Sequence, residues 1–175
     1  MTVAVKAKKT GARRVSRELR SRVEPLLEIE YAYMDSVFFR QRNAETQLFN
    51  IELPPLPLVA WYQPTRDDIA ELTKSTPQLM KTPEERLMFL RFNFSKRKLK
   101  MLKKKIQTEG LSNELGEEFM LWHGRSEHLR EYLVRTNLAL VLAMAKRTRL
   151  GDVDFAEIVS EGNMALLRAI EKFNI

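Results

Sequence analysis

The densest run of chemically active side chains lies between Arg91 and Lys105, in the sequence FLRFNFSKRKLKMLKKKI. Residues 81–108 contain ten Lys or Arg against two Glu, a net charge of +8. Cationic side chains in such a run can neutralise phosphates and release counterions, which gives salt-dependent nucleic-acid affinity without reading the base sequence. A solvated face of a long helix is the alternative explanation, because lysine-rich helix faces are common.

Phenylalanines alternate with these charges, and Phe92 is expected to point away from Phe89 and its neighbours on the apolar side. A nucleic-acid base could stack on Phe92. The same ring could instead pack against another helix, as phenylalanine usually does in helical bundles. Both alternatives remain open at this stage.

The last segment, FAEIVSEGNMALLRAIEKFNI, begins at Phe155 and has the sharpest helical spacing. At about 100° per residue, one side collects the apolar residues and is predicted to be the core stripe. Its members are Phe155, Ile158, Val159, Gly162, Leu166, Ala169, Ile170 and Phe173. Gly162 costs about 1 kcal/mol of helix propensity relative to alanine, which is tolerable if the backbone must approach a neighbouring helix closely.

The opposite side of this helix is polar except for Met164 and Leu167. Its members are Glu157, Ser160, Glu161, Met164, Leu167, Arg168 and Glu171. A lone exposed apolar residue is unremarkable on a soluble protein. An adaptable side chain ringed by carboxylates is also how an apolar anchor for a basic partner would be built.

Residues that perform catalysis or bind metals are sparse in this sequence. His123 and His128 are the only histidines, there is no cysteine, and neither HExxH nor a phosphate-cradling glycine loop occurs. Both histidines are predicted to be helix-surface residues. We therefore expect no enzyme activity, no catalytic residue, no metal and no cofactor.

The elements that must position these residues are all predicted to be helical, since no alternating strand pattern occurs. Residues 1–12 form a basic arm without apolar periodicity, predicted to be disordered. Residues 13–50 form an N-terminal helical segment, with helical spacing from Arg13 to about Met34 and a kink or a helix boundary expected at Pro25. A proline-rich linker, 51–64, separates this segment from a helical domain at 65–175.

Helix boundaries inside that domain are predicted from capping residues. The stretch after Thr65 suggests one short helix, TRDDIAELTKS. Thr82 as N-cap, with Pro83 next and Glu85 three residues on, predicts a helix to about Gln107. A break is expected near Gly124, with Ser126 capping the next helix. Asp154 and Glu157 are predicted to open the last helix.

Charge is distributed unevenly along the chain. Residues 1–22 carry +7 and residues 81–108 carry +8, whereas 23–80 and 109–175 carry −5 and −3. Alternating basic and acidic segments suit a protein that touches both nucleic acid and another protein. The absence of cysteine and of any long apolar run predicts a cytoplasmic location, with neither export nor membrane contact.

A family resemblance appears in LVRTNLALVLAMAKR, followed by DFAEIVSEGNMALLRAIEKF. These residues resemble the start of the second conserved region of bacterial sigma-70 family sigma factors. The resemblance covers Leu133 to Ile175 and rests on the order of its parts. These are a hydrophobic helix with an Asn-Leu step, a short loop, then Glu-Gly-Asn and a Lys-Phe terminus.

The resemblance implies an all-α bundle of sigma region-two type that binds core RNA polymerase at the clamp of its largest catalytic subunit. The residues implied to face the polymerase are Glu157, Ser160, Glu161, Asn163, Met164 and Leu167. In the family, the preceding helix and the region before it help to hold promoter DNA. Asn137 is therefore a candidate for base contact, or is instead buried and satisfied by backbone groups. The candidates for DNA backbone contact are Arg91, Lys96, Arg97 and Lys100.

This sequence departs from the family pattern at several positions. It has Glu157 where Asp is common, Ser160 where Gln is common, Ala165 where Gly is common and Ala139 where Arg is common. The family's DNA-melting segment is expected after Ile175, so the sequence is interpreted as a truncated sigma factor. A regulatory adapter that competes with intact sigma factors, or a basic nucleic-acid-binding protein, is the alternative. An anti-sigma factor is a further candidate partner.

Overall fold

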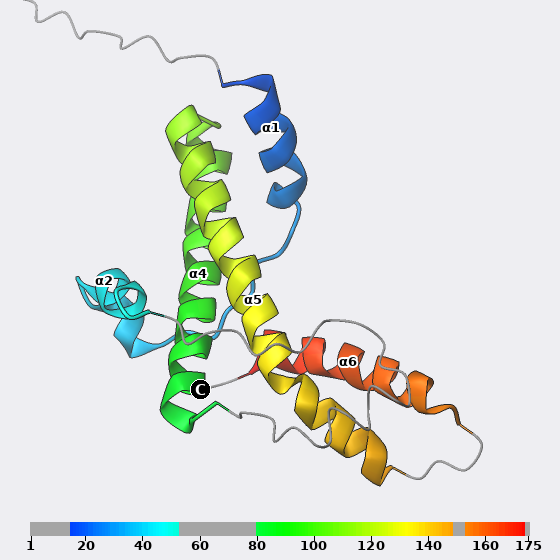
Figure 1. Ribbon diagram of the computed structural model, residues 1–175. Helices are drawn as coiled ribbons and strands as arrows, with labels where there is room; N and C mark the ends of the chain where they lie inside the picture. The colour runs from blue at the N-terminus through cyan, green and yellow to red at the C-terminus, as the bar shows by residue number, and fades with distance from the viewer. Residues whose placement is uncertain (1–14, 53–79, 149–152, 174–175) are drawn as a thin grey trace, which may run out of the picture.

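The computed structural model describes residues 15–52, 80–148 and 153–173, and every regular element in these ranges is helical (Figure 1). The elements are α1 (Arg17–Val23), η1 (Glu24–Leu27), η2 (Val37–Arg40), α2 (Ala44–Phe49), α4 (Thr82–Glu109), α5 (Asn113–Arg147) and α6 (Phe155–Lys172). The predicted all-α class is therefore confirmed. The predicted arm at 1–12, the helix after Thr65 and the linker beyond residue 52 lie outside the described residues.

The N-terminal helix is shorter than predicted. It runs as α1 to Val23 and then tightens into the 3₁₀ turn η1, which contains Pro25. Proline has no N–H to donate to an earlier carbonyl, so the α-helix does not continue through it. From residue 28 to residue 36 the backbone has no regular structure. Helical structure does not reach Met34, whereas the boundary that was one of the two roles expected of Pro25 is observed.

The long helix α4 begins one residue earlier than the capping pattern predicted. Lys81, not Thr82, is the N-cap, and its backbone N–H donates to Oε2 of Glu84 at 3.1 Å. Glu84 rather than Glu85 therefore satisfies the free donor at this end of the helix. The helix ends at Gly110, whose φ of 88° favours glycine.

Helix α5 is continuous over 35 residues, so the predicted break at Gly124 was wrong. Ser112 is its N-cap and accepts from the backbone N–H of Leu115 at 3.2 Å. Ser126, predicted to cap a second helix, is buried inside α5. Packing on both sides of Gly124 outweighs the modest helix penalty of a single glycine.

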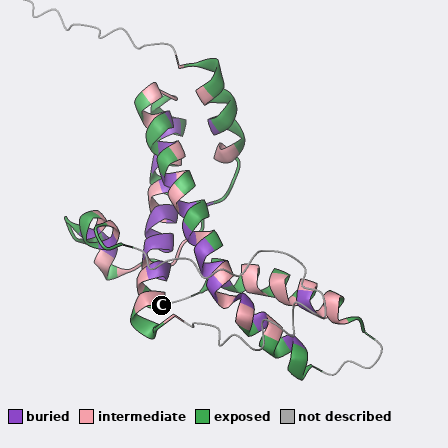
Figure 2. Ribbon diagram, viewed as in Figure 1, coloured by how far each residue is buried: buried purple, intermediate pink, exposed green. Residues whose placement is uncertain are grey.

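Two clusters of buried side chains form the core, and α5 contributes to both (Figure 2). The first cluster joins α4 and the beginning of α5 to the N-terminal segment through Val23, Tyr31, Phe39 and Leu48. The second joins α4, the middle of α5 and α6. Residues 15–52 thus share a core with α4 and α5, while the predicted domain boundary at 51–64 stays a prediction.

Helix α6 lies alongside the C-terminal half of α5 (Figure 1). Asp154 is its N-cap, as predicted, and accepts from the N–H of Ala156 at 3.5 Å. Val159 and Ile170 of the predicted core stripe are buried, but Ala169 is exposed. Phe173 is 44% exposed and stacks on Phe89 with ring centroids 4.2 Å apart.

Gly162 is a position where the backbone of α6 comes close to a side chain of α5. A Cβ built at Gly162 would lie 2.6 Å from Cγ1 of Val141, nearer than real Cβ contacts allow. The structure therefore meets the condition under which the sequence made Gly162 tolerable, a close approach to a neighbouring helix. Because Val141 is β-branched and stiff, it cannot easily move aside.

Gly162→Ala is therefore expected to lower the free energy of unfolding by about 1 kcal/mol. Overpacking costs about 1–3 kcal/mol, and the gain in helix propensity offsets about 1 kcal/mol of it. Gly124→Ala is the matched control: nothing lies within 4 Å of its Cβ position. It should stabilise the protein by about 1 kcal/mol. Urea denaturation measures both, and equal stabilisation by the two substitutions would contradict the predicted clash.

Candidate functional site

Arg91, predicted to contact phosphates, is buried at 2% exposure. Its Nε donates to the carbonyl of Leu48, and its Nη2 donates to the carbonyl of Ile51. Burial lowers the pKa of its guanidinium, because the charged form loses contact with water. Contact with a phosphate would require Arg91 to face the solvent, and it does not. Arg91 instead holds the end of α2 and the residues after it against α4.

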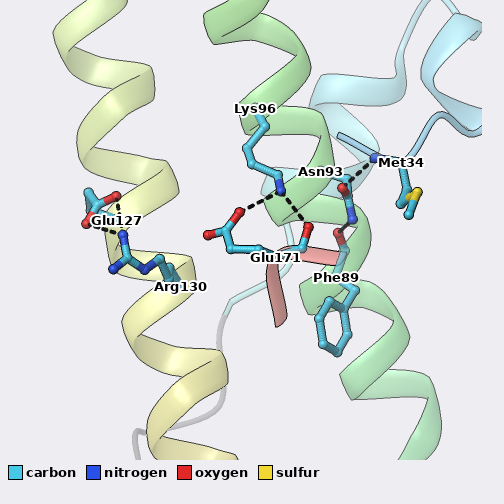
Figure 3. A network of polar contacts seen from close by, with 7 residues as sticks. All are labelled: Met34, Phe89, Asn93, Lys96, Glu127, Arg130 and Glu171. Carbon is cyan, nitrogen blue, oxygen red and sulfur yellow. Dashed lines mark hydrogen bonds and ion pairs between the residues drawn. The ribbon is translucent and has the colours of Figure 1, made fainter. Parts of the chain in front are cut away.

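Lys96 is also buried, at 4% exposure. Its Nζ lies 3.0 Å from Oε2 of Glu171 and donates to the carbonyl of the same residue (Figure 3). The ammonium also lies 4.5 Å from the ring centroid of Phe92. Phe92 is 1% exposed, so its ring packs in the core and is not available to stack on a base. Lys96 therefore fixes the end of α6 to α4.

Other polar groups of α4 bind residues 28–52, a segment that we call the strap. Asn93 accepts from the N–H of Met34 at 2.8 Å (Figure 3). Arg97 donates to the carbonyl of Phe39 at 3.2 Å, and Lys103 donates to that of Ile29 at 3.0 Å. An irregular segment must find partners for its backbone groups, and α4 supplies several of them. The sequence analysis missed Asn93 and Lys103 in this role.

Lys100 remains exposed among the four basic candidates, with its Nζ 5.7 Å from the ring centroid of Tyr33. Arg97 is half-buried. The basic run is therefore partly an internal binding face for the strap, which differs from both explanations weighed from the sequence.

Asn137 is half-buried on α5, and its Nδ2 donates to the carbonyl of Leu133 at 2.8 Å. This geometry fits the second alternative for Asn137, in which backbone groups satisfy its side chain. Its amide nitrogen also lies 3.4 Å from Oγ1 of Thr136. A contact with a base would have to compete with these bonds.

The outer face of α6 is narrower than the sequence predicted. Glu157, Glu161 and Met164 are exposed, and Met164 is 46% accessible. Ser160 is half-buried, and Leu167 packs against the second core cluster. Of the six residues predicted to face the polymerase, three are therefore exposed, and we call Glu157, Glu161 and Met164 the α6 face; Arg168 and Glu171, on the same side of the helix, are exposed as well.

Asn163 lies at the edge of this face and is half-buried. Its Oδ1 is buried and accepts no hydrogen bond from the described part of the chain. Neither Glu157 nor Glu161 forms an ion pair with any described residue. Both carboxylates are thus available to cations from outside.

No described helix is long and apolar enough to cross a membrane. Across residues 15–52, 80–148 and 153–173, no group of three His, Asp or Glu side chains is placed to hold a metal ion. The α6 face presents one apolar side chain and two carboxylates to solvent.

Curated relatives match part of the chain. The principal sigma factor HrdC of Streptomyces coelicolor is 40% identical over 48 residues, which are 27% of this chain and 14% of HrdC. The sigma factor SigA of Microcystis aeruginosa is 39% identical over 54 residues, 31% of this chain and 12% of SigA. Over these stretches the chain is similar to RNA polymerase sigma factors. The resemblance seen in the sequence is thereby confirmed.

The sigma-70 relationship rests on short matches. SigA of Mycoplasma genitalium is 44% identical over 52 residues, yet the match covers only 10% of that protein. No protein-family model matches the sequence, and no solved structure gives a significant match. The matched stretches thus span about a seventh or less of each sigma factor named here.

Proposed function

We propose that the chain acts in transcription initiation by binding core RNA polymerase through α6. Its relatives are RNA polymerase sigma factors. The observation that carries the proposal is the exposed Met164, one turn after Glu161 and two turns after Glu157, whose carboxylates pair with no cation of the described residues. The partner surface is the clamp of the largest catalytic subunit, as the family resemblance implies.

The chemistry of the α6 face supports a basic, partly apolar partner. Methionine is flexible and polarisable, so it fills irregular gaps on a partner surface. An apolar side chain surrounded by charged groups has the arrangement of a small interface centre with a polar rim. The carboxylates add steering of a positively charged partner, an effect that salt weakens.

Met164→Asp and Glu161→Lys are each expected to weaken binding to core RNA polymerase about tenfold, which corresponds to about 1.4 kcal/mol. The first removes the apolar centre, and the second repels a basic surface. Competition against an intact sigma factor for core polymerase measures the effect. Neither side chain is buried, so folding should be unaffected, and circular dichroism checks this.

Met101→Asp and Glu118→Lys are the matched controls. Met101 is 54% exposed on α4, and Glu118 is exposed on α5. The two control substitutions therefore change exposed side chains of the same types outside the α6 face. They should compete as well as the parent protein. If the controls weaken competition as much as the α6 variants, the assignment of the α6 face is wrong.

A regulatory adapter is the second candidate function, and the state of the basic candidates favours it. Arg91, Lys96 and Arg97 are engaged within the chain, which leaves Lys100 as the exposed member of the proposed DNA-binding set. Such a chain would occupy the clamp with little promoter DNA contact. If the chain is an adapter, adding it to an intact holoenzyme should inhibit promoter opening. If the chain is a functional initiation factor, it should support promoter opening.

A further inference from the structure

A small cavity lies where the C-terminal end of the strap, from the last residue of α2 onward, meets α4 and α5. It has a volume of about 160 Å³. Its walls are formed by Phe49, Ile51, Arg91, Arg125, His128 and Leu129. None of these residues belongs to the α6 face, and no role has been given above to Arg125 or His128.

Arg91 brings a positive charge to the wall of this cavity. Two of its nitrogens donate to carbonyls, and no carboxylate of the described chain lies within ion-pair distance. The lowered pKa of the guanidinium agrees with a buried cation whose charge is not balanced by a nearby acid. Carbonyl dipoles satisfy its hydrogen bonds but do not neutralise it.

Arg125 brings a second guanidinium, held flat by aromatic rings. Its Cζ lies 4.6 Å from the ring centroid of Trp122 and 5.3 Å from that of Phe49. Its nearest described carboxylate, Glu45, is 3.9 Å away and is already bound by Lys98 at 2.7 Å. One carboxylate is thus shared by two cations, and the surroundings of the cavity carry net positive charge.

The size of the cavity limits what it can hold. Pockets for drug-sized ligands measure roughly 300–1,000 Å³, whereas this one has space for about five waters at about 30 Å³ each. A tetrahedral oxyanion fits such a volume, and a whole nucleotide does not. Planar guanidinium groups bind oxyanions bidentately and need little reordering to do so.

We propose that this cavity binds the phosphate group of a small molecule, with Arg125 and Arg91 as the charged groups and His128 at its mouth. The phosphate is either free or the terminal group of a nucleotide whose remainder stays outside. The fluorescence of Trp122 can report binding, because the guanidinium of Arg125 lies over the indole ring. A bound phosphate would shift that guanidinium.

The test uses the full chain carrying Trp61→Phe, which leaves Trp122 as its sole tryptophan. Inorganic phosphate is titrated at constant ionic strength, with chloride as the balancing ion, and Trp122 fluorescence and calorimetric heat are recorded. A saturable response is expected. Arg125→Gln should weaken phosphate binding at least tenfold, whereas Arg130→Gln, a surface arginine of α5 paired with Glu127, should not change it.

Two further arms separate the sources of the phosphate. Saturable binding of inorganic phosphate assigns the site to the free ion, and binding of adenosine monophosphate alone assigns it to a nucleotide. No saturable response to either overturns the proposal, as does an equal response in Arg125→Gln and the parent. Binding of a DNA duplex that Arg125→Gln weakens, with no response to either small molecule, also overturns it. Because polymerase competition is not involved, failure here is independent of the function proposed for the α6 face.

Discussion

Arg91→Met is expected to lower the free energy of unfolding by about 3 kcal/mol. Each charge-assisted hydrogen bond from the guanidinium to a buried carbonyl contributes about 1.5–3 kcal/mol, and Arg91 makes two, to Leu48 and Ile51. Removing the buried charge recovers part of the sum, because an apolar side chain of similar length tolerates burial. Urea denaturation followed by circular dichroism measures the difference.

Arg86→Met is the matched control for this prediction. Arg86 lies on the same helix but is exposed and forms no ion pair with the described residues. Its replacement should change stability by no more than about 0.5 kcal/mol. Arg91→Met should also speed proteolysis within the strap, residues 28–52. If both variants unfold at the same urea concentration, Arg91 does not anchor the strap.

The last helix was the part of the fold most accurately predicted. Its apolar spacing, the Asp154 cap and the close approach at Gly162 all depend on contacts local to one helix and its neighbour. Strong 3.6-residue periodicity leaves few alternatives for such a segment. Leu167 was predicted to lie on the outer side of the helix, but it packs against the second core cluster. Periodicity defines the sides of a helix but not how much of each side the neighbouring elements cover.

The role of the basic run could not be derived from its charge. Charge alone predicts an affinity for phosphates or water, whereas the structure supplies carbonyls of the strap as partners for Arg91 and Arg97. One signal was present in the sequence. At helical spacing Arg91 shares a face with Leu87, Met88 and Phe94, and a cation among apolar neighbours indicates burial with a partner.

The continuity of α5 shows the limit of local signals. Gly124 and Ser126 together suggested an end and a new beginning, since glycine weakens a helix and serine caps one. In the structure Trp122 and Leu129 are buried on either side of them, in the first and second clusters. Long-range packing of this kind overrides a local penalty of about 1 kcal/mol.

Glu171→Ala is expected to lower the free energy of unfolding by about 2–3 kcal/mol, more than Lys96→Met does. Breaking a buried ion pair from one side costs about 3–5 kcal/mol, because the remaining charge stays buried without a partner. The value is reduced here because the Glu171 side chain is 44% exposed. Lys96→Met removes the buried ammonium instead, so its cost should be about 1 kcal/mol or less.

A double-mutant cycle tests this asymmetry by urea denaturation. Lys96→Met should partly rescue Glu171→Ala, because the unpaired ammonium is what makes the single variant unstable. The surface pair of Arg130 and Glu127 on α5 is the control, and its cycle should give no more than about 0.5 kcal/mol. If the two substitutions lower the free energy of unfolding by strictly additive amounts, Lys96 and Glu171 do not stabilise the fold as a pair. Since this ion pair fixes the end of α6 to α4, Glu171→Ala should also make the protein a weaker competitor for core polymerase. This effect is expected although Glu171 lies outside the α6 face.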